Sequence, residues 1–111
     1  MDMIGKLVFI SSPYSHKDGY VVKERYECVC SVAAKLMREG MMTFSPIVYG
    51  HSIAQHGDIP TDWKYWGDYC KAILSRCQKM VVVRMPGWEE SEGVKEEIKI
   101  ALEMGIEIEY I

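Results

Sequence analysis

Short apolar runs alternate with longer amphipathic segments along this chain, and that alternation constrains its fold more than any other feature. The runs have the length of β-strands and span residues 7–10, 41–44, 80–83 and 106–111. Apolar side chains recur with helical spacing in the segments between them, at about residues 20–39, 63–74 and 92–104. The order is therefore β-α-β-α-β-α-β, with short connections.

This order predicts a single α/β domain with a parallel sheet of four to five strands and helices on both faces, of the flavodoxin- or Rossmann-like type. Ligands of such sheets bind at the carboxyl ends of the strands, near the point where the strand order reverses. The loops after Ile10, Phe44 and Arg84 are therefore expected around one crevice. The segment that begins at Ser45 and Pro46 is predicted to be less regular.

Helix periodicity also predicts which side chains are buried. On the first helix the apolar stripe is Val22, Tyr26, Val29, Ala33, Leu36 and Met37, and Gly40 follows where a helix-ending glycine belongs. On the last helix the stripe is Val94, Ile98, Ala101, Leu102 and Gly105. Asp62 or Thr61 is expected to cap the middle helix.

Length, charge and cysteine content limit the possible functions. A chain of 111 residues has room for one core, and with a net charge of −3 and scattered basic residues it lacks the surface of a nucleic-acid-binding protein. No apolar run approaches the roughly 20 residues of a membrane helix, and the start lacks a signal-peptide pattern. The four cysteines form no C-x-x-C pair, so we expect reduced, mostly buried thiols in a cytoplasmic protein.

The last helix offers a candidate catalytic carboxylate. Glu96 is predicted to point to solvent, whereas Glu97 lies at the border of the buried stripe and faces the strand ends. Partial burial and the positive end of the helix would tune the pKa of such a carboxyl group. The alternative is a helix-start charge that only stabilises the helix. Ser91 and Gly93 precede it, either as a cap and a turn or as an anion site.

Two further groups of residues could contact a ligand. Ser12, Pro13, Tyr14 and Ser15 follow the first strand, where a stiffened loop either presents hydroxyl groups or is simply a turn. The middle helix carries Trp63, Tyr65, Trp66, Asp68 and Tyr69, whose rings either pack in the core or stack on a base. His51 and His56 have no second pair of metal ligands near them, so no metal site is expected and His51 is interpreted as lining a pocket.

Together these residues resemble the nucleoside 2-deoxyribosyltransferase-like superfamily, and within it a short branch known as DUF1937. The resemblance runs from the first strand to the last helix. It rests on Pro13-Tyr-Ser-His16, Arg25, Val32-Ala-Ala34, Phe44-Ser45, His51, Ile53, Gly87-Trp88, Ser91, Gly93, Val94, Glu97 and Ile98.

The resemblance implies roles for several of these residues. Glu97 would be the nucleophile, in a frame that Ser91, Gly93 and Ala101 complete. A serine at position 91 is the form that contacts a 5′-phosphate in monophosphate N-glycosidases of the superfamily. Tyr14 would orient the glutamate or the sugar.

In two respects the chain differs from the superfamily. The superfamily places an aspartate that handles the base near the start of the middle helix. Asp68 is available, but the spacing from Trp66 puts this role at or near Cys70. An acidic residue often found just before the third strand is Lys79 here.

The expected function is hydrolysis or transfer at the N-glycosidic bond of a nucleoside or, by the Ser91 match, of a (deoxy)nucleoside 5′-monophosphate. Glu97, Tyr14 and Asp68 would be catalytic, and Ser12, Pro13, Ser15, His51, Trp88, Ser91 and Gly93 would contact the substrate. No cofactor is expected. A binding module without activity is the alternative, and because the aromatic residues of the middle helix spread around its circumference, a homodimer or larger homo-oligomer is predicted.

Overall fold

The computed structural model describes residues 6–111. Helices and strands follow one another in the predicted order, with one additional helix after the second strand. The elements are β1 (Leu7–Ser11), α1 (Gly19–Arg38), β2 (Met42–Phe44), α2 (Pro46–Ala54), α3 (Trp63–Leu74), β3 (Lys79–Val82), α4 (Glu92–Met104) and β4 (Glu107–Tyr110).

All four strands form one parallel sheet in the order β2-β1-β3-β4, which confirms the predicted α/β class. β1 is central, since Phe9 is in register with Phe44 of β2 on one side and with Met80 of β3 on the other. The chain thus leaves β1 toward one edge of the sheet and later returns to its opposite side. The carboxyl end of β1 therefore lies at the switch point, where parallel sheets bind their ligands.

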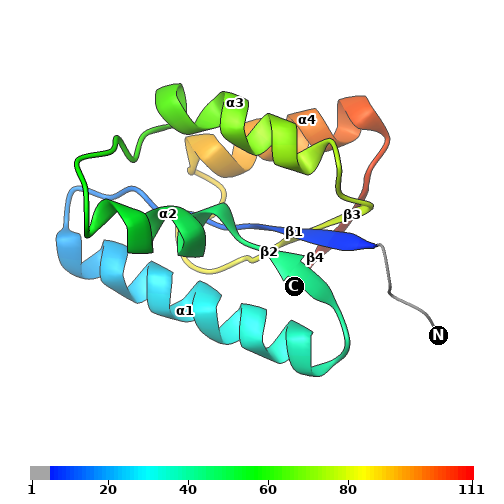
Figure 1. Ribbon diagram of the computed structural model, residues 1–111, viewed down its shortest axis with the longest axis horizontal. Helices are drawn as coiled ribbons and strands as arrows, with labels where there is room; N and C mark the ends of the chain where they lie inside the picture. The colour runs from blue at the N-terminus through cyan, green and yellow to red at the C-terminus, as the bar shows by residue number, and fades with distance from the viewer. Residues whose placement is uncertain (1–5) are drawn as a thin grey trace.

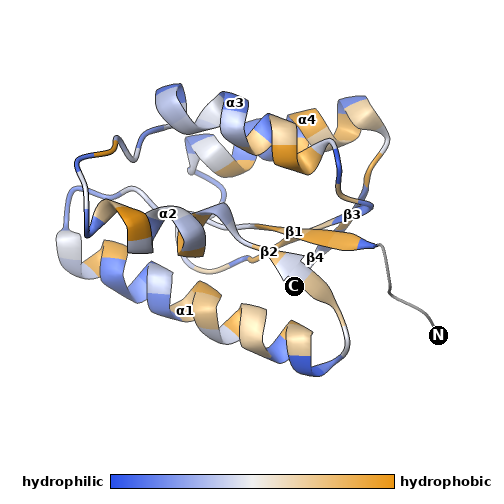
Figure 2. Ribbon diagram, in the orientation of Figure 1, coloured by the Kyte–Doolittle hydropathy of each residue, from blue (hydrophilic) through white to orange (hydrophobic). Residues whose placement is uncertain are grey.

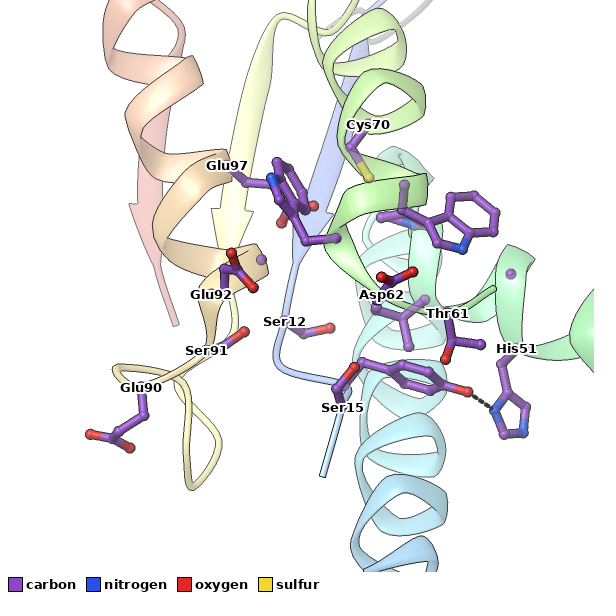
Figure 3. Close-up of a pocket in the computed structure, with 17 residues that line it drawn as sticks. Ser12, Ser15, His51, Thr61, Asp62, Cys70, Glu90, Ser91, Glu92 and Glu97 are labelled. Carbon is purple, nitrogen blue, oxygen red and sulfur yellow. Dashed lines mark hydrogen bonds between the residues drawn. The ribbon is translucent and has the colours of Figure 1, made fainter. Parts of the chain in front are cut away.

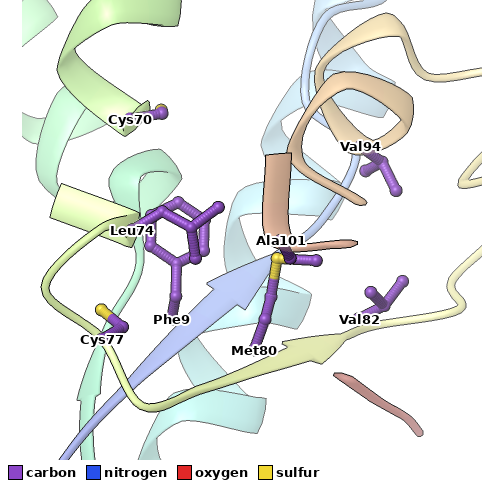
Figure 4. Packing of buried hydrophobic residues seen from close by; sticks show 8 residues of the cluster. All are labelled: Phe9, Cys70, Leu74, Cys77, Met80, Val82, Val94 and Ala101. Carbon is purple, nitrogen blue, oxygen red and sulfur yellow. The ribbon is translucent and has the colours of Figure 1, made fainter. Parts of the chain in front are cut away.

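Helices cover both faces of the sheet, as Figure 1 shows, with α3 and α4 on one face and α1 on the other. On the first face Phe9 and Met80 pack with Leu74 of α3 and Ala101 of α4 (Figure 4). β1 is apolar along most of its length, while the helices carry both apolar and polar residues (Figure 2). The core on the α1 face is built mainly from Val8, Ile10, Val81, Val83, Met85, Val29 and Leu36.

Side-chain caps and a glycine fix where α1 begins and where α4 begins and ends. Asp18 accepts a hydrogen bond of 2.9 Å from the backbone N–H of Tyr20 at the start of α1. Ser91 accepts one of 3.2 Å from the N–H of Val94 at the start of α4. Gly105 ends α4 in the left-handed conformation, with φ of +68°, which is a common helix ending for glycine. Asp62 precedes α3, but its side chain makes no capping bond.

Helix α2 is the main correction to the sequence-based prediction, which gave an irregular segment here. Ser45 and Pro46 start this helix: the Ser45 side chain accepts a hydrogen bond of 3.1 Å from the N–H of Val48, and Pro46 occupies the first turn. Proline is favoured at this position because its missing N–H would have no helical partner there. The same dipeptide that suggested a loop is therefore a helix start.

Three predicted buried residues are exposed, namely Met37, Leu102 and Gly105. Gly105 ends α4, and the other two errors concern which side of a helix faces the sheet. Met37 of α1 is 60% exposed, and Leu102 of α4 is 67% exposed. The buried residues of α4 are Val94, Glu97 and Ala101, so the carboxylate lies within the buried face and not at its border. Of the four free cysteines only Cys70 and Cys77 are buried, whereas Cys28 is exposed. No helix among residues 6–111 has both the length and the apolar character to cross a bilayer.

Candidate functional site

A cavity of about 310 Å³ opens at the carboxyl end of β1. Its wall is formed by the loop after β1, the start of α2, the α3 helix with the residues before it, and the start of α4 (Figure 3). Most of the residues predicted to contact a ligand line it, namely Ser12, Tyr14, Ser15, His51, Ser91, Gly93 and Glu97. The predicted crevice at the strand ends is therefore present.

Glu97 is the most unusual residue of the cavity, because it is a carboxylate with only 5% of its surface exposed. Ser11, the last residue of β1, donates a hydrogen bond of 2.6 Å from Oγ to Glu97 Oε1. Burial raises the pKa of Glu97 from 4.5 to about 7, although hydrogen bonds from Ser11 and the neighbouring Cys70 thiol lower it. Near neutral pH this group is therefore poised between its charged and neutral forms, as in many catalytic carboxylates.

Cys70 is a buried residue of α3 that also lines the cavity. Burial, followed by the nearby charge of Glu97, raises the pKa of its thiol. The thiol therefore keeps its proton at neutral pH, and it can serve as a donor to Glu97 but not as a nucleophile.

Tyr14 and His51 form a second polar group in the cavity. Tyr14 Oη and His51 Nδ1 share a hydrogen bond of 2.7 Å, drawn as the dashed line in Figure 3. The His51 ring also stacks on Tyr26, with ring centroids 3.8 Å apart. Burial raises the pKa of Tyr14, so its hydroxyl remains protonated at neutral pH. This pair holds the Tyr14 hydroxyl in place within the cavity.

Two serines offer unused hydrogen-bonding capacity. Ser12 Oγ is buried and has no hydrogen-bond partner among the described residues, although it lines the cavity. A buried hydroxyl without a partner is costly, and a ligand would satisfy it. Ser91 Oγ accepts a bond from Val94 but still has its own proton to donate.

Three predicted contact residues lie elsewhere. Asp68 is exposed and is not part of the cavity wall, because it lies on a different side of α3 from Trp63, Trp66 and Cys70. Pro13 is buried but does not reach the cavity, and half-buried Trp88 contacts Tyr110, with ring centroids 5.9 Å apart. The acidic residue that does line the cavity near α3 is Asp62, labelled in Figure 3.

The aromatic residues of α3 divide into two groups. Trp63 and Trp66 line the cavity, and Trp66 Nε1 donates a hydrogen bond of 2.9 Å to the carbonyl of Pro60. Tyr65 and Tyr69 are exposed and, with Tyr49 of α2, form a surface that we call the tyrosine patch. The tryptophans line the cavity and pack against the core, whereas Tyr65 and Tyr69 neither pack in the core nor line the cavity.

Arg25 of α1 connects two of the loops at this end of the sheet. Its Nη1 donates a hydrogen bond of 2.9 Å to the carbonyl of Ser15, and Nη2 donates one of 3.5 Å to the carbonyl of Pro86. Gly87 packs directly beneath this guanidinium group and has a φ of +91°, a conformation that side-chain-bearing residues rarely adopt. One side chain therefore holds the loop after β1 and the loop after β3 in a fixed relation.

Comparison with family models matches residues 6–110 to the domain of unknown function DUF1937. The chain belongs to the DUF1937 family. A comparison with curated proteins found no match.

Sequence reasoning missed several residues of the site in this DUF1937 domain, among them Glu90 and Glu92 at the start of α4. Ser11 is the last residue of a buried strand, and only its partner Glu97, distant in the sequence, reveals a role. Asp62 was interpreted as a helix cap alone. Cys70 was considered only as a replacement for an aspartate, whereas it lies beside Glu97. Residues 6–111 contain no group of three or more His, Cys, Asp or Glu side chains arranged to hold a metal ion.

Proposed function

We propose that this protein breaks the N-glycosidic bond of a nucleoside or nucleotide, with Glu97 as the catalytic carboxylate. The observation that carries the proposal is the burial of Glu97 in the wall of a cavity at the switch point, with a pKa raised to about 7. The resemblance of the sequence to nucleoside 2-deoxyribosyltransferases points to the same residue.

The chemistry suits an isolated buried carboxylate. As the bond between the base and the anomeric carbon breaks, the sugar gains positive charge, as in an oxocarbenium ion. A desolvated carboxylate stabilises that positive charge most strongly in the transition state, where the charge is largest. Glu97 then bonds to the anomeric carbon while the bonding electron pair leaves with the base. Water completes hydrolysis, or a second base completes transfer.

The remaining groups of the cavity have complementary roles in this proposal. The Tyr14 hydroxyl, held by His51, contacts the sugar. The unpartnered Ser12 hydroxyl is available to a sugar oxygen. The start of α4, with Ser91, faces the 5′ oxygen, whether that oxygen is a hydroxyl or carries a phosphate. Asp62 takes the place that the sequence gave to Asp68, at the base.

The test is base release measured by chromatography after incubation with a panel of nucleosides and their 5′-monophosphates. Glu97→Gln is expected to abolish release, because the amide keeps the shape of the side chain and removes its charge. Glu96→Gln, one position earlier on the same helix, is the matched control and is expected to change little. Retention of activity by Glu97→Gln, or an equal loss in both variants, contradicts the assignment.

One observation favours a second function, a nucleotide-binding module without turnover. Asp68, the residue expected to protonate the departing base, lies outside the cavity. Such a module would show ligand-dependent thermal stabilisation but no base release by wild type.

Calorimetric titration with a nucleoside and with its 5′-monophosphate measures how much the start of α4 contributes to the binding of a phosphate. If Ser91 binds the phosphate, Ser91→Ala weakens the binding of the monophosphate and leaves the binding of the nucleoside unchanged. If wild type binds the two ligands with equal affinity, Ser91 has no role in phosphate binding.

A further inference from the structure

The cavity is strongly acidic. Four acidic residues line it, Asp62, Glu90, Glu92 and Glu97, although the Glu90 carboxylate points away from the cavity (Figure 3), and among residues 6–111 no lysine or arginine lines it. His51 is the only basic side chain in the wall, and its ring is engaged by Tyr14 and Tyr26. A ligand of this cavity therefore meets negative charge on several sides without a compensating cation.

We propose that the substrate is a nucleoside whose base carries a positive charge, such as an N-alkylated purine or a pyridinium, and that has no 5′-phosphate. This inference rests on the proposed function and specifies its substrate. Two independent features of the cavity support it: the negative charges in its wall and the aromatic side chains beside them.

The charges at the start of α4 oppose a phosphate. A helix N-terminus carries about half a positive charge, which alone would attract an anion. Here Glu92 follows Ser91 in the cavity wall and has a full negative charge when ionised, whereas the Glu90 carboxylate points away from the cavity (Figure 3). Glu92 is in the first turn of α4, where its carboxylate already offsets the helix dipole. The full charge of Glu92 outweighs the half charge of the dipole, so this position favours a 5′-hydroxyl over a phosphate dianion.

The aromatic wall favours a cation. Trp63, Trp66 and Tyr14 line the same cavity as Asp62. The faces of such rings attract a positive charge, tryptophan most strongly, and the attraction grows when water is excluded. A flat cationic base would stack on an indole ring and also be attracted by the nearby carboxylates. A neutral base would gain only the stacking.

The departure of the base is also easier for a cationic substrate. A neutral base departs easily only if an acid protonates it, a task that would fall to Asp62 in this cavity. A cationic base needs no proton. The bond between the anomeric carbon and the base nitrogen breaks, its electron pair neutralises the base, and Glu97 forms an ester with the sugar. Water then adds its oxygen to the anomeric carbon, releases a proton to solvent and restores the Glu97 carboxylate.

Two matched pairs of ligands test the proposal, guanosine against N7-methylguanosine and dihydronicotinamide riboside against nicotinamide riboside. Each pair differs mainly by one positive charge. Binding is measured by calorimetry on Glu97→Gln, which cannot turn over. We expect at least one cationic member to bind about tenfold more tightly than its neutral partner. Adding Asp62→Asn should reduce that ratio, and the 5′-monophosphate of the preferred nucleoside should bind more weakly than the nucleoside.

Base release by wild type separates the possible failures. If neutral nucleosides or 5′-monophosphates bind and react as well as the cationic nucleosides, after correction for uncatalysed release, this inference is overturned and the proposed function stands. If no member of either pair binds but other nucleosides release their base, the inference is also overturned. If no nucleoside or nucleotide binds or reacts, both proposals are overturned.

Discussion

The burial of Glu97 predicts an unusual dependence of stability on pH. In the folded protein this group keeps its proton up to a pKa of about 7, whereas an exposed glutamate releases it near 4.5. Its contribution to folding is therefore fully present below pH 4.5 and is lost as the pH rises through 7. At about 1.4 kcal/mol for each pH unit between these pKa values, the ionised carboxylate costs about 3 kcal/mol of the free energy of unfolding.

The substitution Glu97→Gln removes this cost. At pH 4.5 the variant should have nearly the stability of wild type, because the wild-type side chain is then neutral in the folded state. At pH 8.5 the variant should be more stable than wild type by about 3 kcal/mol. This gain accompanies the predicted loss of activity, the usual exchange between stability and function at a strained site.

Urea denaturation between pH 4.5 and 8.5 measures the effect, and the other titrating groups cancel when the variant is compared with wild type. Glu96→Gln makes the same chemical change one position earlier on the same helix and is the matched control. If the difference for Glu97→Gln is independent of pH, Glu97 is not a buried carboxyl group with a raised pKa, and the argument for its role fails.

Further predictions concern the neighbours of this residue, the clamp that Arg25 forms between the loops after β1 and β3, and assembly. Ser11→Ala removes a charge-assisted bond of about 1.5–3 kcal/mol, so the pKa of Glu97 should rise by at least about one pH unit, which carboxylate NMR measures; an unchanged pKa contradicts the role of Ser11. Gly87→Ala should cost about 2 kcal/mol in urea denaturation, because the added Cβ meets the Arg25 guanidinium and φ is positive; unchanged stability refutes the clamp. The tyrosine patch predicts a homodimer by light scattering, and a monomer of 12.8 kDa over a tenfold dilution rules it out.

Local sequence patterns were sufficient to predict the strands and most of the helices. The runs at Val8–Ile10 and Met80–Val83 consist of residues that are buried on both sides, and such runs are recognisable without tertiary information. The start of α2 was missed because Ser45 and Pro46 occur both in loops and at helix starts. What decides between these outcomes is packing: Gly50 lies so close to Trp66 that an added Cβ would be 2.8 Å from the indole.

The candidate site was predicted less completely, since its main contacts join distant parts of the chain. Glu97 was identified as a candidate, but its position within the buried face of α4 was not. Periodicity alone predicts that a polar residue such as Glu97 lies at the border of the buried face and that Leu102 lies in the core. Asp62 and Asp68 could not be ranked from the sequence, since both lie in or beside α3 and only the rotation of that helix brings one of them to the cavity. The role of Ser11 depends on a residue at the far end of the chain.

The hydrogen bond between Ser11 and Glu97 joins residues that are 86 positions apart, and this has a consequence for how the protein is made. During synthesis, β1, α1 and β2 leave the ribosome long before α4. The two strands can therefore pair, and α1 can pack on them, while the face that α4 will cover is still exposed to solvent. The cavity can close only after α4 has emerged. A nascent chain that still lacks α4 therefore cannot carry the complete cavity, and Glu97 is desolvated only when α4 docks on the sheet.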